Sequence, residues 1–510
     1  RVERASMHVD DSSRVETGAG ICVLFVDLNN FARYPTVAVG YLTAAMRASG
    51  LRVDVFSPLS VGVDGVHRER RQRWWGGAEE KLRYRTGISR LTPIRRARTL
   101  VAEIQGSTSA IARKRIVAEF RNRLATRPQV VLISAYLLHF EACKEIASIC
   151  RSSGIPVVIG GGYFSQGEVI DHWRKGIDAS IFAGEAEPVI AELIHRVATR
   201  KDLKGLPGLI SSNDSAPRVA KPVSNLDDLE FPDYSDFPWN AYPHAIVPML
   251  TGRGCGWGAC TFCSDITSSA GRTYRSRSSE NVLEELQHQA RNHDASLFVF
   301  TDLKLNSSPG VWHALISRTR SAVPEGRWVG AVHVGARGGD GLGPAELRAA
   351  ATSGLTRVTT GLESGSQRLL DRMKKGTDLK ETSRFLRDAG AAGISVRATM
   401  ILGHPGEKAA DIDASTEFLT QHEGLIDRIM LNRFALIAGT VLHRRLLAAP
   451  ENYPGVEITE TRNRTATLEH RYAPAYSRAY RRAAGRLIDA VHRINRRRLP
   501  AVAQEFDGVM

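Results

Sequence analysis

Short apolar runs alternate with amphipathic stretches over the first 200 residues. The apolar runs fall at 21–26, 51–56, 130–134, 156–159 and 179–183. Apolar residues recur at helical spacing over 37–49, 138–151, 166–175 and 186–199. Continuous apolar strands separated by helices predict a parallel sheet that is covered on both faces. We therefore expect an α/β domain over residues 19–200, after a disordered lead-in at 1–18.

The carboxyl ends of four of these predicted strands carry small and polar residues. Ligands bind such sheets beyond the carboxyl ends of the strands. The glycines at 160–162 allow a close approach of the backbone to a ligand, although a tight strand-to-helix turn also needs glycine. Because several strand ends share this character, we expect a binding site there. Its candidate residues are Asn30, Ser134, Tyr136, Gly160, Gly161, Gly162, Tyr163, Gly184 and Glu185.

A second α/β unit is predicted at 245–440, after a proline- and aspartate-rich linker at 201–244. Six strand candidates recur at 245–250, 296–301, 327–334, 356–361, 394–402 and 428–435, and five of them lead into helices. A closed TIM barrel needs eight such units. The pattern therefore predicts a partial (β/α)6 barrel, whose active site lies at the carboxyl ends of its strands.

Three of the six cysteines lie in one glycine-rich loop directly after the first strand of this barrel. Cys255, Cys260 and Cys263 have the spacing C-x4-C-x2-C. A closed zinc site takes four protein ligands, whereas a cluster held by three cysteines leaves one metal position open. The loop is therefore a candidate metal site with room for a substrate or cofactor. Cys143 and Cys150, seven residues apart on a predicted helix, are expected to be buried core thiols.

The chain is basic, with 69 lysines and arginines against 54 acidic residues and a formal net charge of +15. The charge concentrates in an insertion at 67–128 and in a small, mainly helical C-terminal region at 441–510. A solvated basic surface and an acidic partner or substrate both explain this charge. No apolar run is long enough to span a bilayer, and the few cysteines are clustered. We expect a cytoplasmic protein without a membrane partner.

The cysteine loop and three later segments resemble the radical S-adenosylmethionine superfamily. The family's usual loop is C-x3-C-x2-C with an aromatic residue before the last cysteine, and Phe262 takes that place despite one extra residue in the first spacing. The later segments are 298–302, 361–376 and 400–407. This resemblance implies that the three cysteines hold a 4Fe-4S cluster whose open iron binds S-adenosylmethionine. It implies cofactor contacts from Phe262, Thr301, Asp302, Glu363, Arg397 and Leu402, of which Asp302 and Arg397 rest mainly on an expected position at a strand end.

The region before the barrel is similar to the Rossmann-like domain of cobalamin-binding radical S-adenosylmethionine proteins. The similarity rests on the glycine-rich strand end, the segment 184–187 and the linker, and the whole resemblance covers about 19–440. The motif that gives many cobalamin enzymes a cobalt-binding histidine is missing, since the equivalent loop reads DLNNFARYP. We therefore expect cobalamin whose lower face takes no histidine from that motif.

The resemblance implies a methyltransferase that moves a methyl group from methylcobalamin to an unactivated carbon through a 5′-deoxyadenosyl radical. It also implies an external one-electron reductant of the flavodoxin or ferredoxin type. A peptide, a carrier-bound group or a small natural-product intermediate remains open as substrate, and the catalytic residues toward it are unknown. One alternative is a cobalamin radical enzyme for cyclisation or ring rearrangement. Others are an RNA methylthiotransferase, although a nucleic-acid substrate is not favoured, and a non-enzymatic cobalamin- or zinc-binding protein.

Overall fold

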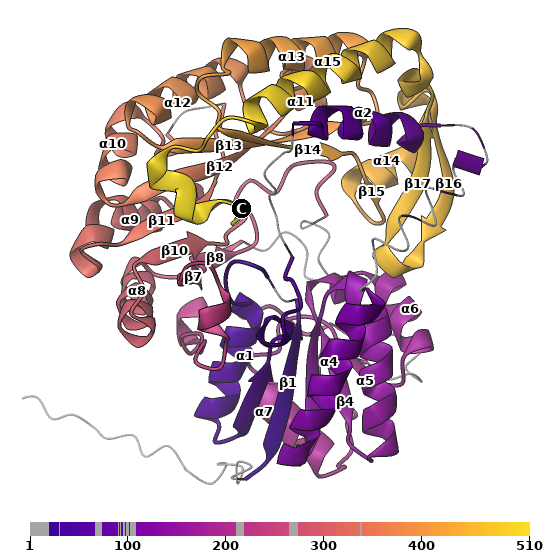
Figure 1. Ribbon diagram of the computed structural model, residues 1–510, viewed down its shortest axis with the longest axis vertical. Helices are drawn as coiled ribbons and strands as arrows, with labels where there is room; N and C mark the ends of the chain where they lie inside the picture. Colours follow the sequence, from indigo (N-terminus) through magenta and orange to yellow (C-terminus); the bar gives the residue numbers. More distant parts are fainter. Residues whose placement is uncertain are drawn as a thin grey trace, which may run out of the picture.

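The computed structural model describes residues 20–509 except 30, 67–73, 90, 92, 95–96, 98–100, 102–108, 211–218, 265–273 and 337–338. The predicted lead-in at 1–18 therefore lies outside the described residues. Figure 1 shows two α/β units, the first in indigo and magenta and the second in orange and yellow.

The first unit is built on a six-stranded sheet with the order β2-β1-β3-β4-β5-β6. Its strands are β1 (Cys22–Leu28), β2 (Arg52–Phe56), β3 (Val130–Ala135), β4 (Val157–Gly160), β5 (Ser180–Phe182) and β6 (Leu209–Ile210). All neighbouring pairs are parallel except β5 and β6. Every residue of β1 and β3 is buried, as their continuous apolar sequence requires. The predicted Rossmann-like parallel sheet is confirmed.

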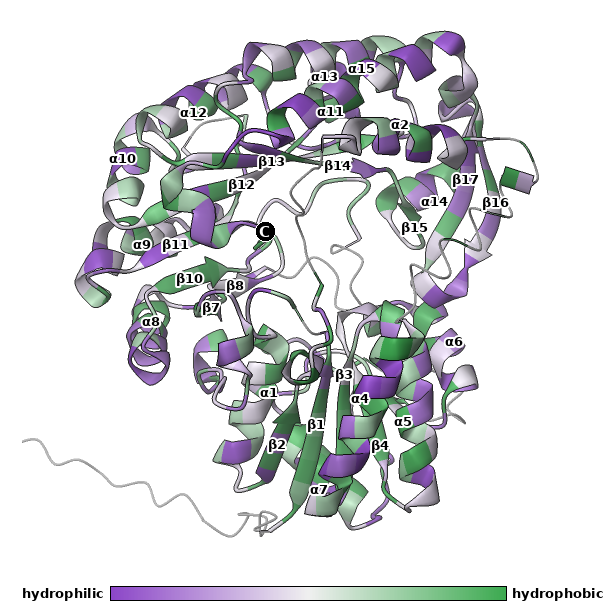
Figure 2. Cartoon of the chain, viewed as in Figure 1, coloured by the Kyte–Doolittle hydropathy of each residue, from purple (hydrophilic) through white to green (hydrophobic). Residues whose placement is uncertain are grey.

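Helices cover both faces of this sheet. The helices α1 (Val37–Ala48) and α7 (Ile190–Ala198) pack on one face, and α4 (Ala110–Arg123), α5 (Phe140–Ser152) and α6 (Gly167–Gly176) pack on the other. Figure 2 shows the apolar strands enclosed between helices whose outer sides are polar. Cys143 and Cys150 are fully buried in the α5 face of the core, as predicted for core thiols.

The second unit is a six-stranded parallel sheet with the order β14-β13-β12-β11-β10-β7. Its strands are β7 (Ile246–Met249), β10 (Leu297–Phe300), β11 (Arg327–Val332), β12 (Leu355–Glu363), β13 (Ser395–Leu402) and β14 (Arg428–Arg433). The helices of this unit are α8 (Ser279–His293), α9 (Pro309–Ala322), α10 (Pro344–Thr352), α11 (Gln367–Met373), α12 (Leu379–Ala391) and α13 (Ala409–Gln421), and they form its outer layer (Figure 1). All six predicted strands are found, and β7 and β14 stay unpaired with each other as edges of a partial barrel.

The C-terminal region adds helices and a small antiparallel sheet. Its elements are β15 (Leu436–Ile437), α14 (Val441–Ala448), β16 (Val456–Arg462), β17 (Thr467–Tyr472) and α15 (Arg478–Asn495), with sheet order β15-β17-β16. The hydrophobic pattern did not predict the β16–β17 hairpin, because its strands are half exposed and carry no continuous apolar run. Helix α15 buries Tyr480, Leu487 and Val491 on one face.

The basic insertion divides between the two units, since its helix α4 packs on the first sheet and its helix α2 (Gly76–Gly87) packs on the second unit. Helix α2 lies beside α15, where Lys81 and Asp489 form an ion pair of 2.5 Å. The guanidinium of Arg433, the last residue of β14, lies 6.0 Å from the ring of Tyr84 on α2. The insertion therefore covers the exposed edge of the barrel at β14. None of the helices in the described ranges has the length and apolarity needed to cross a bilayer.

Candidate functional site

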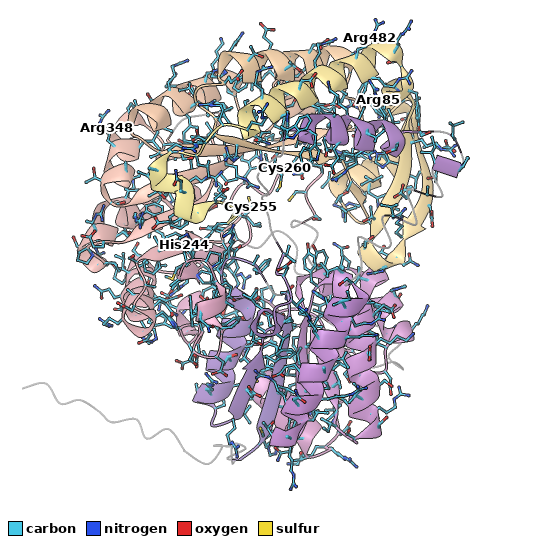
Figure 3. All side chains as sticks on the ribbon, in the orientation of Figure 1. Arg85, His244, Cys255, Cys260, Arg348 and Arg482 are labelled. Carbon is cyan, nitrogen blue, oxygen red and sulfur yellow. The ribbon has the colours of Figure 1, made fainter. Side chains whose placement is uncertain are left out.

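A cavity of about 630 Å³ lies between the two units at the carboxyl edge of the first sheet. The first unit lines it with the ends of β1, β3, β4 and β5 and with residues of α1 and α7. The second unit lines it with the start of the cysteine loop and with Thr301, Asp302 and Leu303 after β10. Figure 3 shows Cys255 and Cys260 in this region between the barrel and the first domain. The cavity thus joins the two sites that the sequence predicted separately.

The strand order explains where the first unit opens. The order β2-β1-β3-β4-β5 places a topological switch point between β1 and β3, which is where open α/β sheets bind ligands. At this point Asn29 donates from Nδ2 to Oγ of Ser134 at 2.6 Å, and both residues line the cavity. The polar strand ends therefore meet at one edge, as the sequence predicted.

The glycines of this edge have different structural roles. A Cβ atom at Gly161 (φ +154°) would lie 2.5 Å from the carbonyl oxygen of Ala135, and one at Gly184 (φ +106°) would lie 2.7 Å from that of Ala220. These two glycines are required by the backbone itself. A Cβ atom at Gly162 would meet nothing within 4 Å, so the turn leaves open space there. Gly160 is similar, since the nearest atom to its Cβ position lies at 3.8 Å.

Three predicted residues of this edge do not lie in the described cavity wall. Tyr136 and Tyr163 form a T-shaped pair with ring centroids 5.2 Å apart and hydroxyl oxygens 3.2 Å apart, but neither lines the cavity. Asn30 lies outside the described residues. In the loop at 29–35 that follows β1, the described residues that line the cavity are Asn29, Phe31 and Tyr34. The described lining includes no histidine.

Glu185 reaches the cavity wall, but its carboxylate is held by protein groups. It pairs with Arg275 at 2.6 Å and with Arg253 at 3.0 Å, and it accepts a hydrogen bond from the backbone nitrogen of Val223 at 2.7 Å. Burial alone would raise the pKa of Glu185, but these hydrogen bonds and charges bring it below the ordinary value. The sequence did not identify either arginine as a partner of Glu185, because this pairing becomes visible only when the two units are brought together.

The cysteine loop is fixed to the barrel at several points. Asp302 accepts hydrogen bonds from the backbone nitrogen of Thr251 at 3.1 Å and from its hydroxyl at 2.7 Å. Burial raises the pKa of Asp302 to about 6. Trp257 donates from its indole nitrogen to the carbonyl oxygen of Lys374 at 3.0 Å, and Thr261 donates to that of Met373 at 2.9 Å. Asp302 therefore shapes the loop before the first cysteine.

A buried lysine sets the charge around the cysteine thiols. Lys375 forms an ion pair of 3.1 Å with Glu363, and its charge acts on both Cys260 and Cys263. Burial raises the pKa of Cys260, and the positive charge of Lys375 opposes that rise. Cationic side chains stabilise the thiolate that binds a metal. The sequence placed Glu363 at the site but missed Lys375, although it lies in the same family-like segment.

The chemistry of the donor set fits an iron–sulfur cluster with three protein ligands. The three cysteines lie on one loop and have intermediate exposure. In a four-iron cluster each cysteine binds its own iron, so the thiols do not have to converge on a single ion. Within the described ranges, no three His, Cys, Asp or Glu side chains are gathered to hold one metal ion. The positive charge of Lys375 suits the thiolates of such a cluster.

The other predicted cofactor contacts differ in their position. Glu363 and Leu402 end β12 and β13, and the ring of Phe262 lies 6.3 Å from that of His404 just beyond β13. Arg397 is instead the third residue of β13, buried and with Nη2 at 3.4 Å from Sδ of Met430. The strand-end position expected for Arg397 is wrong, because β13 runs on for five residues beyond it.

Residues 249–419 match the family model described as the radical SAM superfamily. An uncharacterised methyltransferase of Pyrococcus horikoshii is 26% identical over 302 residues, which cover 57% of this chain and 64% of that protein. The chain therefore spans less than two thirds of the length of this relative.

Two solved structures share the fold of both units. One is TsrM from Kitasatospora setae, a radical S-adenosylmethionine methyltransferase with cobalamin and a 4Fe-4S cluster bound, with a TM-score of 0.60, 18% identity and coverage of 86% of this chain and 80% of that chain. The other is OxsB, a cobalamin-dependent S-adenosylmethionine radical enzyme with aqua-cobalamin and S-adenosylmethionine bound, with a TM-score of 0.64, 16% identity and coverage of 88% and 64%.

Proposed function

We propose that this chain, which contains a radical SAM domain at residues 249–419, is a cobalamin-dependent radical S-adenosylmethionine methyltransferase. The reaction is the transfer of a methyl group to an unactivated carbon of a natural-product or peptide substrate. One observation carries the proposal: a single cavity of about 630 Å³ connects the carboxyl edge of the Rossmann-like sheet with Cys255 of the cysteine loop. Radical and methyl chemistry need two cofactors that face each other, and this cavity is bounded by a candidate site for each.

The barrel side binds the cluster and S-adenosylmethionine in this proposal. Cys255, Cys260 and Cys263 hold the cluster, and Lys375 balances the negative charge of their thiolates. When bound, these groups supply a 5′-deoxyadenosyl radical that removes a hydrogen atom from the substrate, while cobalamin supplies the methyl group. The task of the chain is to orient the groups and to exclude competing reactions. Thr301 lines the cavity, as Leu303 does, and is a candidate for contacts with these bound groups.

The Rossmann-like side binds cobalamin in this proposal. Gly160 and Gly162 leave space at the sheet edge, since a Cβ atom at either would meet no atom closer than 3.8 Å. Behind them the cavity continues between the sheet and α7, where Leu132, Ile190 and Leu193 give it an apolar wall. A pocket that is mostly apolar with a few polar groups suits a large organic cofactor. Asn29 and Ser134 supply polar groups at the same edge.

The proposal requires an external one-electron reductant, as radical S-adenosylmethionine enzymes do. The substrate is a small molecule, a carrier-bound group or a peptide, and the basic surface favours an acidic one. Cyclisation and ring rearrangement use the same two cofactors and differ in the product. The methyl transfer is favoured here because a named methyltransferase is among the relatives and another is among the structures of the same fold.

The test is anaerobic purification, reconstitution with iron, sulfide and cobalamin, and reaction with S-adenosylmethionine and a chemical reductant. The proposal expects bound cobalamin, an iron–sulfur absorption band and two products of S-adenosylmethionine, 5′-deoxyadenosine and S-adenosylhomocysteine. A candidate substrate should gain the mass of one methyl group. Deoxyadenosine without S-adenosylhomocysteine would point to a non-methylating radical enzyme. A protein that binds cluster but no cobalamin would refute the proposal.

A further inference from the structure

The cysteine loop is closed at its base by a short two-stranded ladder. Strand β8 (Gly252–Arg253) precedes the first cysteine, and strand β9 (Arg275–Ser276) follows the third. The two strands pair antiparallel, with Arg253 opposite Arg275. Both ends of the loop at 254–274 therefore carry an arginine on neighbouring strands.

Glu185 of the Rossmann-like domain binds both of these arginines. Its Oε1 accepts from Nη2 of Arg275 at 2.6 Å, and its Oε2 accepts from Nη1 of Arg275 at 2.9 Å and lies 3.0 Å from Nη1 of Arg253. A bidentate arginine–carboxylate pair fixes direction as well as distance. The backbone nitrogen of Val223 also donates to Oε2 at 2.7 Å, so the linker holds the carboxylate in place.

Two further groups complete the contact on Arg253. Glu187 accepts from Nη2 of Arg253 at 2.6 Å, and its side chain is only 8% exposed. The ring of Tyr41 on α1 lies 5.3 Å from the guanidinium carbon of Arg253, within the range of a cation–π contact. The two arginines and two glutamates balance in charge. Such partly buried pairs are costly to break, because the remaining partner keeps an uncompensated charge.

We propose that Glu185 and Glu187 form a clamp that holds the base of the cysteine loop in the shape that binds its cluster. Retention of the cluster by the barrel then depends on the Rossmann-like domain. The clamp residues are positioning residues, since they act on the cysteines through the loop. The inference rests on the proposed function only in taking the cysteines as cluster ligands.

The physical reason lies in the freedom of the loop. Gly254, Gly256 and Gly258 give its backbone many conformations, and ordering such a backbone has a large entropic cost. The clamp fixes both ends of the loop and so reduces the number of shapes the free loop can take. Its four side chains all line the cavity, so the same contacts set the distance from the loop to the opposite wall.

The experiment compares Glu185→Gln with Glu192→Gln as a matched control. Glu192 is a glutamate of α7 that is 54% exposed and pairs only locally with Arg196. In the reconstituted full-length protein, an iron chelator is added without oxygen, and the loss of the iron–sulfur band is followed. We expect the loss to be about tenfold faster in Glu185→Gln, because the neutral amide weakens the charge-assisted contacts to both arginines. We expect no change in Glu192→Gln.

A charge exchange keeps the inference testable if Glu185→Gln fails to fold. Arg253→Glu and Glu187→Arg should each speed the loss of iron, and the double variant should restore much of the wild-type rate. Equal rates in wild type and in all clamp variants would overturn the inference. A second assay, cleavage of the loop by chymotrypsin after Trp257 and Phe262, needs no cofactor. Equal cleavage rates in wild type and the clamp variants would also overturn the inference. A wild type that retains iron but binds no cobalamin would instead contradict only the proposed function.

Discussion

Glu407, at the turn that follows β13, gives a quantitative prediction about pH and stability. Its Oε2 accepts hydrogen bonds from the backbone nitrogen of Gly403 at 2.7 Å and from the hydroxyl of Tyr480 on α15. Its backbone carbonyl accepts from the hydroxyl of Tyr472 at 2.7 Å. The side chain is almost wholly buried, and burial raises its pKa from 4.5 to about 7. The replacement Glu407→Gln keeps the shape and removes the ionisation.

The sign of the effect follows from the two pKa values. In the folded protein the carboxyl of Glu407 keeps its proton up to about pH 7, whereas in the unfolded chain it loses the proton near its ordinary pKa of 4.5. The stability that this group contributes is therefore full at low pH and is lost as the pH rises through about 7. From about pH 5.5 to about pH 8 the loss is about 2 kcal/mol. The variant Glu407→Gln should not show this pH-dependent loss of stability.

The assay is thermal unfolding of wild type and Glu407→Gln across this pH range, followed by circular dichroism. A difference of about 2 kcal/mol in a unit of roughly 150–250 residues moves the Tm by about 4–8 °C. The Tm of the variant should therefore fall less than that of the wild type as the pH rises. Parallel pH profiles for the two proteins would refute the reasoning, because they would mean that Glu407 ionises alike in the folded and unfolded states.

Three further changes test the site. Cys260→Ala should abolish both cluster iron and deoxyadenosine formation, as measured by iron analysis and chromatography. The control Cys150→Ala, a change at a buried core thiol, should keep both. A Cys260→Ala protein that still cleaves S-adenosylmethionine would contradict the ligand assignment. Gly161→Ala should destabilise the fold by about 1–3 kcal/mol, because φ +154° and a contact of 2.5 Å oppose a Cβ atom. Gly162→Ala should instead keep the Tm and lower cobalamin binding in an absorbance titration. Equal binding by wild type and Gly162→Ala would remove that glycine from the site. Lys375→Met should destabilise by about 3 kcal/mol, because it leaves a buried glutamate without its ion-pair partner, and an unchanged Tm would show that the pair carries little stability.

The sequence predicted the central strands of both sheets because they are buried on both sides, whereas the short edge strand β6 (Leu209–Ile210) lies in the predicted linker and was missed. Strands β1, β3 and β7 read as continuous apolar runs, and glycines 354 and 393 end the helices before β12 and β13 with a positive φ. The same periodicity located the strand ends, and therefore the cavity residues at the ends of β3, β4 and β10, such as Ser134, Gly160 and Thr301. The position of a residue within its strand was predicted less well, as the error at Arg397 shows. Apolar runs do not mark the residue at which the hydrogen bonding of a strand ends.

Contacts between distant segments were not predictable from local pattern. Glu185 and Arg253 are far apart in sequence, and each alone reads as an ordinary surface charge. The hairpin at 456–472 is another case, since its strands are half exposed and mostly polar, and they are stabilised by the residues that they contact. Only the folded chain shows which of its many arginines are paired across the domain boundary.

Two connections that the sequence did not predict bind the two units together. The turn of the hairpin at Asn463–Thr465 packs against α6. Arg464 of this turn donates to the carbonyl oxygen of Leu137, just after β3, at 2.9 Å. The clamp at Glu185 joins the units on the cysteine-loop side. A cavity between two domains keeps a fixed width only when both are restrained, because relative domain motion is the default expectation. An apolar cluster that joins Tyr34 with Ile246 and Leu297 also crosses the boundary. Two connections of different chemistry, one through a backbone carbonyl and one through paired charges, supply that restraint, and the distance between the two candidate cofactor sites follows from both.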